Sequence, residues 1–286
     1  MSAMRRLVVG VVLGAAAAGA APAEAVLKKV KSPLPADAQC QALGAVLRPP
    51  PFRPGERLEF DVDALGARAG TLNLQTLPER SDGRWPVEIS VETNTFFNKI
   101  RKVKGLGVST LDARTLRPVR YHEESLENGV RRQAEVSYGP GHEVKLASTT
   151  DGHTATVSYR WANDLSDVVG AIPLLRSLPL KVGSTVCFDA YGVRRMWRVW
   201  GTVVGREHVS LPVGEFEAWH LIAEAARLDA PDARREIHLW VSDDARRLPL
   251  AAVGSIDLGA VRATLKAWSR PFEKGGRAEH KGNLTW

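Results

Sequence analysis

The stretch IHLWVSDDARRLPL, residues 237–250, places two adjacent carboxylates and two adjacent arginines between apolar runs. Ile237, Leu239 and Val241 occupy every second position before the charges, and Leu248 and Leu250 resume the alternation after them. A period of two is typical of strands. Neighbouring carboxylates on a turn stay solvated, whereas acid–base chemistry needs two differently shielded carboxylates. We therefore predict a hairpin, not a catalytic site, with a structural turn that contains Asp243, Asp244, Arg246 and Arg247.

The same alternation recurs from Phe52 onward, for example in RLEFDVD (57–63), GTLNLQT (70–76) and PVEISVE (86–92). Asn128-Gly129 favours a tight type I′ turn, because both residues accept positive φ angles. Further reversals are expected at 138–141, at 150–152 and at Tyr191-Gly192. This pattern predicts a mostly β protein, an antiparallel meander of about ten strands in which one face is buried.

One segment has helical spacing instead. In residues 164–180 the apolar side chains fall three or four positions apart, beneath an Asn163 or Asp164 cap. We predict a single helix over 164–178 that packs against the sheet, with a kink or break at Pro173. The residues of its apolar face are Leu165, Val168, Val169, Ile172 and Leu175.

A long strand is expected after this helix, in MWRVWGTVV (196–204). Trp197 and Val199 point to one face, and Met196, Arg198 and Trp200 to the other. Gly201 and Gly205 are candidate positions for bulges where so long a strand bends.

The chain begins with the three-part layout of a secretory signal: Arg5-Arg6, an apolar run, and small residues that end at Ala25. We expect a signal peptide at 1–25, an N-terminal extension at 26–51, an antiparallel β domain at 52–268 and a loose tail at 269–286. No later segment is long and apolar enough to be transmembrane. These features predict an exported protein, in the periplasm or at the outer-membrane surface of a Gram-negative bacterium.

The chain has two cysteines, Cys40 and Cys187, and a formal net charge of +7. An even cysteine count in an oxidising compartment favours a disulfide, which would tie the extension to the β domain. The basic residues are scattered among acidic ones, which predicts a mixed solvated surface, although peripheral membrane contact stays open. Export argues against nucleic acid as a partner.

Catalytic, metal-binding and phosphate-binding motifs are weak in this sequence. His220 and His238 lie on adjacent expected strands, but no HExxH, paired CxxC or close His-x-His spacing accompanies them. There is no G-x-S-x-G, and Cys187 lies inside an expected strand. Gly105-Leu106-Gly107 starts like a phosphate loop, but Thr110 stands where the next glycine is needed. We predict no catalytic residue, no metal site and no cofactor.

Four blocks carry a family resemblance: PFRPGERLEFDVDALGARAGTLNL (51–74), NDLSDVVGAIPLLRSLPLKVGSTV (163–186), VSLPVGEFEAWHL (209–221) and IHLWVSDDARRLPLAAVGSIDLGAVRATL (237–265). In this order they resemble the exported bacterial family catalogued as domain of unknown function 3108. That family implies an exported, mostly antiparallel β domain but no reaction. The strands-plus-helix pattern is similar to the half-barrel of lipoprotein carriers, a sheet curled around an apolar cavity. The extension with Cys40 departs from the family pattern.

A curled sheet with an apolar concave face is either filled by its own side chains or holds an apolar ligand. For the second case we predict a half-barrel-like sheet that binds a lipid or another apolar ligand. The candidate cavity residues are Phe60, Val168, Ile172, Leu175, Trp197 and Trp200. One alternative is a structural or adaptor protein that holds an envelope protein partner by strand edges or by the N-terminal extension. Another is a hydrolase that uses His220, His238 and a nearby acid.

Overall fold

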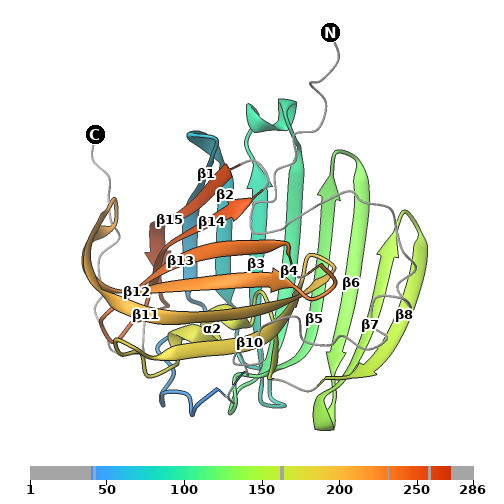
Figure 1. Ribbon diagram of the computed structural model, residues 1–286, viewed down its shortest axis with the longest axis horizontal. Coiled ribbons are helices and arrows are strands. Elements are labelled where there is room, and N and C mark those ends of the chain that lie inside the picture. The colour runs from blue at the N-terminus through green and yellow to red at the C-terminus, as the bar shows by residue number, and fades with distance from the viewer. Residues whose placement is uncertain (1–39, 41–42, 162–163, 231, 257–258, 272–286) are drawn as a thin grey trace.

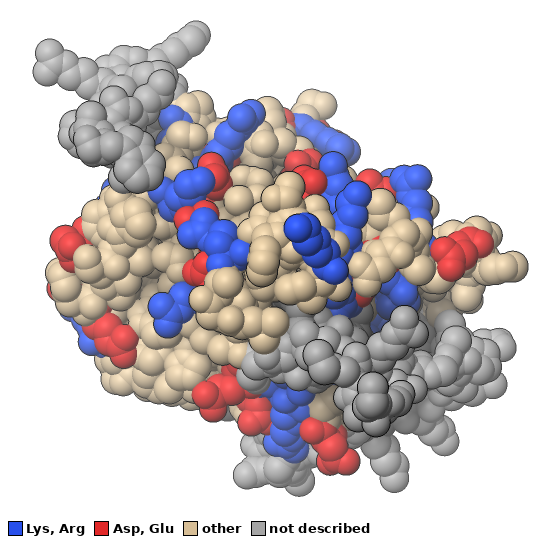
Figure 2. Space-filling view, turned by 90° about the horizontal axis from the view of Figure 1, so that it is seen from above, with Lys and Arg blue, Asp and Glu red and all other residues tan. Residues whose placement is uncertain are grey.

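The computed structural model describes residues 40, 43–161, 164–230, 232–256 and 259–271 (Figure 1). The expected signal peptide, most of the expected extension and residues 272–286 of the expected tail lie outside these residues. None of the helices in the described part of the chain is long and apolar enough to cross a membrane. On the face shown in Figure 2, basic and acidic side chains lie interspersed.

Fifteen described strands form one sheet, in the order β8-β7-β6-β5-β4-β3-β2-β1-β15-β14-β13-β12-β11-β10-β9. Neighbouring strands are antiparallel except the short pair β9 and β10, which is parallel. The sheet confirms the predicted meander. Its first strand in the sequence, β1, pairs with its last strand, β15. The first eight strands are β1 (Arg57–Ala64), β2 (Ala67–Thr76), β3 (Arg84–Thr93), β4 (Val103–Asp112), β5 (Pro118–Glu127), β6 (Val130–Tyr138), β7 (Glu143–Thr150) and β8 (His153–Arg160). The other seven are β9 (Leu165–Asp167), β10 (Thr185–Gly192), β11 (Arg195–Leu211), β12 (Gly214–Arg227), β13 (Arg234–Ser242), β14 (Pro249–Ile256) and β15 (Gly259–Ser269).

The expected number of about ten strands was too low. Strands β7 and β8 carry few large apolar side chains, so period-two alternation of apolar residues marks them poorly. Strand β9 has only three residues, which is too short for any periodic signal.

Turn residues behave as their chemistry predicts in several hairpins. Asn128 and Gly129 connect β5 and β6 with φ angles of 47° and 88°, as a type I′ turn requires. Asp151 and Gly152 do the same between β7 and β8. The reversal predicted at Tyr191-Gly192 lies two residues later, because Gly192 is the last residue of β10.

The single predicted helix is shorter than expected. Residues 165–167 form β9, and helix α2 covers only Ala171–Arg176. Pro173 does not break it, because this residue lies in the first turn, where no backbone donor is needed. The predicted cap Asp164 instead accepts a hydrogen bond from the Leu43 amide at 2.7 Å, and Asn163 lies outside the described residues. Two short 3-10 helices, η1 (Phe97–Lys99) and η2 (Pro140–His142), complete the elements.

The two glycines of β11 have different roles. A register shift between Val203 and Gly205 confirms the bulge predicted there. Gly201 is not a bulge. A Cβ atom at Gly201 would lie 2.6 Å from the Ala223 Cβ atom, so this glycine permits close approach of β12.

The sheet is not closed, and its β9 edge rolls inward against the face of β4–β6. In Figure 1, β10–β13 cross in front of β3–β5. Ser109 on β4 donates to the Asp167 carboxylate at 2.7 Å, and Tyr138 on β6 donates to the Ser166 carbonyl. The Tyr121 and Tyr191 rings of β5 and β10 meet edge to face. One face of β10 therefore packs against β5, and its other face lines the interior of the roll.

Candidate functional site

The interior of the roll contains an apolar cavity of about 380 Å³. Its wall includes five of the six predicted cavity residues: Phe60 on β1, Val168 and Ile172 at the start of α2, Leu175 on α2, and Trp197 on β11. Small side chains of β12, β14 and β15, among them Ala225, Ala252 and Ala263, leave the space open. A volume of this size lies within the range of small-molecule sites in proteins.

Trp200 is not in the wall, and its inclusion among the cavity residues was wrong. Side chains alternate along β11, so Trp200 points away from the face that carries Trp197 and Val199. The Arg234 guanidinium lies 5.7 Å from the centre of the Trp200 ring.

Apart from apolar residues, the wall of this cavity contains five arginines and no acidic residue. Three of them have acidic partners: Arg176 pairs with Glu56, and Arg195 and Arg227 pair with Asp229. The remaining wall arginines are Arg194, in the turn between β10 and β11, and Arg235 on β13, whose side chain also has an interaction partner. These arginines were not predicted from the sequence, because they belong to α2, to the turn between β10 and β11, and to strands β11, β12 and β13.

A second, smaller cavity of about 90 Å³ adjoins the first. The residues that line both are Leu72, Ile89, Val168, Ile172, Val193 and Arg194. Three arginines and three glutamates surround the smaller cavity: Arg101, Arg132, Arg194, Glu123, Glu124 and Glu127. Its glycines, Gly105 and Gly107, belong to β4, where a Cβ atom at Gly107 would lie 3.0 Å from Val169.

A strained turn between β10 and β11 separates the two cavities. Val193 and Arg194 have φ angles of 53° and 59°, which is a rare conformation for a β-branched residue. The buried Glu123 carboxylate accepts hydrogen bonds from both backbone amides at 2.9 Å and from the Tyr121 hydroxyl at 3.0 Å. Burial raises the pKa of Glu123 against the opposing effect of these hydrogen bonds. Such strain persists only where the surroundings hold it, and it is concentrated at functional sites.

Asp167 orders the entry to helix α2. Its Oδ1 atom accepts hydrogen bonds from the amides of Val169 and Gly170 at 3.0 and 2.7 Å, and its Oδ2 atom accepts one from Ser109. Burial raises the pKa of Asp167 to about 7, although these three hydrogen bonds favour the ionised form. Val168, which lines both cavities, is held in place by this turn.

The hairpin turn predicted within residues 237–250 contacts the C-terminal end of α2. Within the turn, Asp244 accepts hydrogen bonds from the Arg246 amide and from Ser242, and forms an ion pair with the Arg246 side chain. Burial opposes the charge on Asp244, but the hydrogen bonds from Arg246 and Ser242 hold its pKa below the usual value. The turn carbonyls of Arg246 and Arg247 accept hydrogen bonds from Arg176 of α2.

Arg176 is also part of a buried ion network. Its Nη1 atom lies 2.6 Å from Glu56 Oε1, and Arg270 Nε lies 2.8 Å from Glu56 Oε2. Arg176 and Glu56 are almost completely buried, so each depends on the other for compensation. The network connects α2, the start of β1 and the β13–β14 turn, which belong to three of the four quoted blocks.

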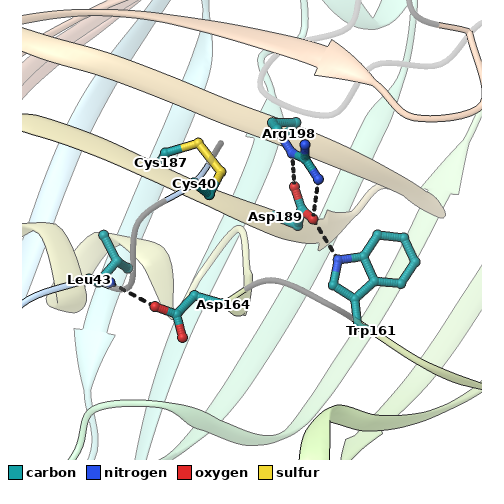
Figure 3. The surroundings of a disulfide bond; sticks show 7 residues. All are labelled: Cys40, Leu43, Trp161, Asp164, Cys187, Asp189 and Arg198. Atoms are coloured by element: carbon teal, nitrogen blue, oxygen red, sulfur yellow. Dashed lines mark hydrogen bonds and ion pairs between the residues drawn. A yellow bond between two sulfur atoms is a disulfide. The ribbon is translucent and has the colours of Figure 1, made fainter. Parts of the chain in front are cut away.

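The predicted disulfide is present between Cys40 and Cys187 (Figure 3). It attaches the N-terminal extension to β10, and the Leu43 amide bonds to Asp164 beside it. Leu43 also packs against the two apolar clusters that contain Leu174 and Ala171 of α2. On the same face of β10, Asp189 pairs with Arg198 and accepts a hydrogen bond from the Trp161 indole at 2.6 Å. The extension thus covers the helix that lines the apolar cavity.

His220 and His238 meet across β12 and β13, with 2.9 Å between Nε2 of His220 and Nδ1 of His238. Glu207 and Glu236 bond to the outer nitrogens of the pair, and both rings stack with Trp240. His238 alternates with Ile237 and Leu239 of the apolar cavity, so the pair faces away from it. Among the described residues, no hydroxyl or thiol side chain bonds to either ring, and no group of three or more His, Cys, Asp or Glu could hold a metal ion.

Comparisons with known proteins agree with this architecture. The model of the family "Protein of unknown function (DUF3108)" matches residues 59–266. A β-barrel-like protein of domain of unknown function DUF1849 from Brucella abortus has the same fold, with a TM-score of 0.50 and 9% identity over 74% of this chain and 95% of that one. An exported protein with a YmcC-like fold from Bacteroides fragilis aligns at a TM-score of 0.32 and 10% identity, over 79% of this chain and 100% of that one. No curated protein matches the chain. The match over residues 59–266 shows that this chain belongs to the DUF3108 family of proteins of unknown function, with a β-barrel-like fold.

Proposed function

We propose that this protein is an exported, non-catalytic envelope protein that binds a lipid or another apolar ligand inside the rolled sheet. The observation that carries the proposal is the 380 Å³ cavity with an almost wholly apolar wall. Protein interiors are close-packed, and an empty apolar space of this size costs contacts that neighbouring side chains would otherwise make. An apolar ligand would restore those contacts.

The disulfide supports an extracytoplasmic location for this activity. Structural disulfides persist in oxidising compartments and are rare in the cytosol of most organisms. The Cys40–Cys187 bond agrees with the signal peptide expected at residues 1–25.

We propose a peripheral membrane contact at the β3–β4 connection. Phe96 and Ile100 are 62% and 44% exposed, and Lys99 and Lys102 beside them are also exposed. Apolar side chains next to lysines are suited to the surface of an anionic membrane. Arg101 of the same connection is buried in the wall of the smaller cavity, so this contact would lie beside the ligand site.

Flotation with vesicles that contain phosphatidylglycerol tests this contact. We expect the wild-type protein to float and a Phe96→Ser/Ile100→Ser variant to lose most of that binding. Val182, which is 59% exposed and follows helix α2, provides the control Val182→Ser. Equal flotation of all three proteins would contradict the contact. Absence of flotation would also contradict it and would favour an envelope protein partner on this surface.

The ligand proposal is tested with N-phenyl-1-naphthylamine, an uncharged dye that fluoresces in apolar surroundings. The purified protein, after its lipids are removed, should bind the dye saturably. Ala252→Trp places an indole in the cavity and should reduce dye binding at least tenfold. Ala267→Trp makes the same change at an exposed position of β15 and should leave binding unchanged.

Circular dichroism would establish that both tryptophan variants are folded. If the wild-type protein takes up no dye, or if the two variants reduce uptake equally, the cavity is not the ligand site. A second change, Ile172→Ala, enlarges the cavity without adding bulk and should retain dye binding.

A further inference from the structure

The smaller cavity has an excess of buried arginine donors that the fold itself does not satisfy. Arg101 is only 4% exposed, and one of its terminal nitrogens pairs with Glu127. Its Nε and Nη1 atoms are buried and have no hydrogen-bond partner among the described residues. A buried guanidinium with unpaired donors is costly unless another group accepts those hydrogen bonds.

Arg132 adds to this excess. It shares Glu127 with Arg101, so one carboxylate faces two guanidinium groups, and the buried Nε atom of Arg132 has no described partner. Proximity to Arg132 contributes to lowering the pKa of Arg101, after burial as the main cause. These two arginines therefore repel each other inside the cavity.

Arg194 is the third cation, and no described carboxylate lies within ion-pair distance of its guanidinium. Burial lowers its pKa, repulsion from Arg132 and Arg195 contributes in the same direction, and attraction to Glu123 opposes the shift without reversing it. The strained turn fixes its backbone through Glu123, and its side chain lines both cavities. Arg194 thus stands where the polar and the apolar spaces meet.

The acidic residues around the smaller cavity do not accept hydrogen bonds from the unpartnered nitrogens of Arg101 and Arg132. Glu124 bonds to Arg131 and Gln133, so its carboxylate is already neutralised. Both oxygens of Glu123 accept backbone amides, and burial disfavours its ionised form. Glu127 is the remaining carboxylate, and it serves Arg101 and Arg132 together.

We propose that the smaller cavity binds the oxyanion head of an amphiphile, a carboxylate or phosphate, whose apolar chain occupies the larger cavity. The inference rests on the proposed function, because it assigns a ligand class to the same site. Arginine donors suit carboxylate and phosphate groups, and charge-assisted hydrogen bonds in a shielded site are strong.

The test compares dodecanoate, dodecyl phosphate and uncharged dodecanol as competitors of N-phenyl-1-naphthylamine. We expect the wild-type protein to bind the two anions at least tenfold more tightly than the alcohol. Arg194→Gln should remove this preference, measured in each protein as the ratio of anion affinity to alcohol affinity. The control is Arg120→Gln, which removes an exposed arginine that pairs with Glu135. Neither residue lines either cavity, so the variant should keep the preference.

Inorganic phosphate separates an amphiphile site from a site for free anions. We expect it not to compete with dodecyl phosphate at concentrations at which the amphiphile saturates the protein. Equal competition would overturn the proposal in favour of a free anion. If the dye binds but the wild-type protein does not distinguish anion from alcohol, or Arg194→Gln keeps the preference, this inference fails and the proposed function stands. If the dye itself does not bind, the proposed function fails.

Discussion

Glu56 and Arg176 are the residues on which the placement of helix α2 depends most directly. Glu56→Gln would leave Arg176 and Arg270 facing a neutral amide in a buried site, so we expect the free energy of unfolding to fall by about 3–5 kcal/mol. Glu59→Gln is the matched control, because Glu59 pairs with Lys266 and both side chains are 39% exposed. This substitution should lower the free energy of unfolding by about 1 kcal/mol or less. Urea unfolding monitored by tryptophan fluorescence measures both, and equal costs would contradict the role of the buried network.

Asp167 should make stability depend on pH in an unusual direction for a carboxyl group. Its pKa is about 7 in the folded protein and near 3.8 when unfolded, so the folded state holds a proton that the unfolded state has lost between these values. The contribution of this group to stability is therefore highest below about pH 4 and declines as pH rises toward 7.

The corresponding experiment compares the wild-type protein with Asp167→Asn at pH 5 and pH 7.5. From this group alone, the free energy of unfolding of the wild-type protein should fall by roughly 2–3 kcal/mol between the two pH values. The asparagine variant cannot titrate, so its decline should be smaller by that amount. Parallel pH profiles would show that Asp167 is ionised in the folded protein across this range.

Among the structural elements, the N-terminal extension and α2 depend on each other. The disulfide closes a loop with a sequence separation of 147 residues, and Leu43 beside it packs on α2. Replacing both cysteines with serine should lower the free energy of unfolding by up to about 5 kcal/mol on the loop-entropy model. Urea unfolding of the wild-type protein with and without a reductant should reproduce this difference, and the double variant should not respond to the reductant. A wild-type protein insensitive to reduction would contradict the stabilising role.

The elements also show where local sequence signals are sufficient. Strands such as β1–β3 and turns such as Asn128-Gly129 follow from alternation and from backbone chemistry, and both were predictable. Helix α2 was overestimated, because residues 165–167 have helical spacing but pair with β10, a contact between distant parts of the chain. Trp200 was misplaced because its size was weighed above the alternation of β11, which already assigned it to the other face.

At the level of the whole molecule, the half-barrel-like curvature was predicted, whereas the inward roll of the β9 edge and the charged cavity were beyond the sequence patterns. The roll depends on contacts such as Ser109 with Asp167, whose partners are 58 residues apart. Arg101, Arg132 and Arg194 lie on three separate segments, and no local motif shows that they share one cavity. The apolar wall could be predicted more readily from the sequence, because its residues belong to strand faces and to one helix with clear periodicity.

The central claim is that the interior of this protein holds an apolar ligand. Native mass spectrometry of the protein, purified without detergent, tests it most directly when combined with solvent extraction and lipid analysis. We expect a bound amphiphile at a near-stoichiometric amount in the wild-type protein and a reduced amount in Ala252→Trp. A mass equal to that of the polypeptide alone, with no lipid in the extract and no uptake when lipid is added, would contradict the claim.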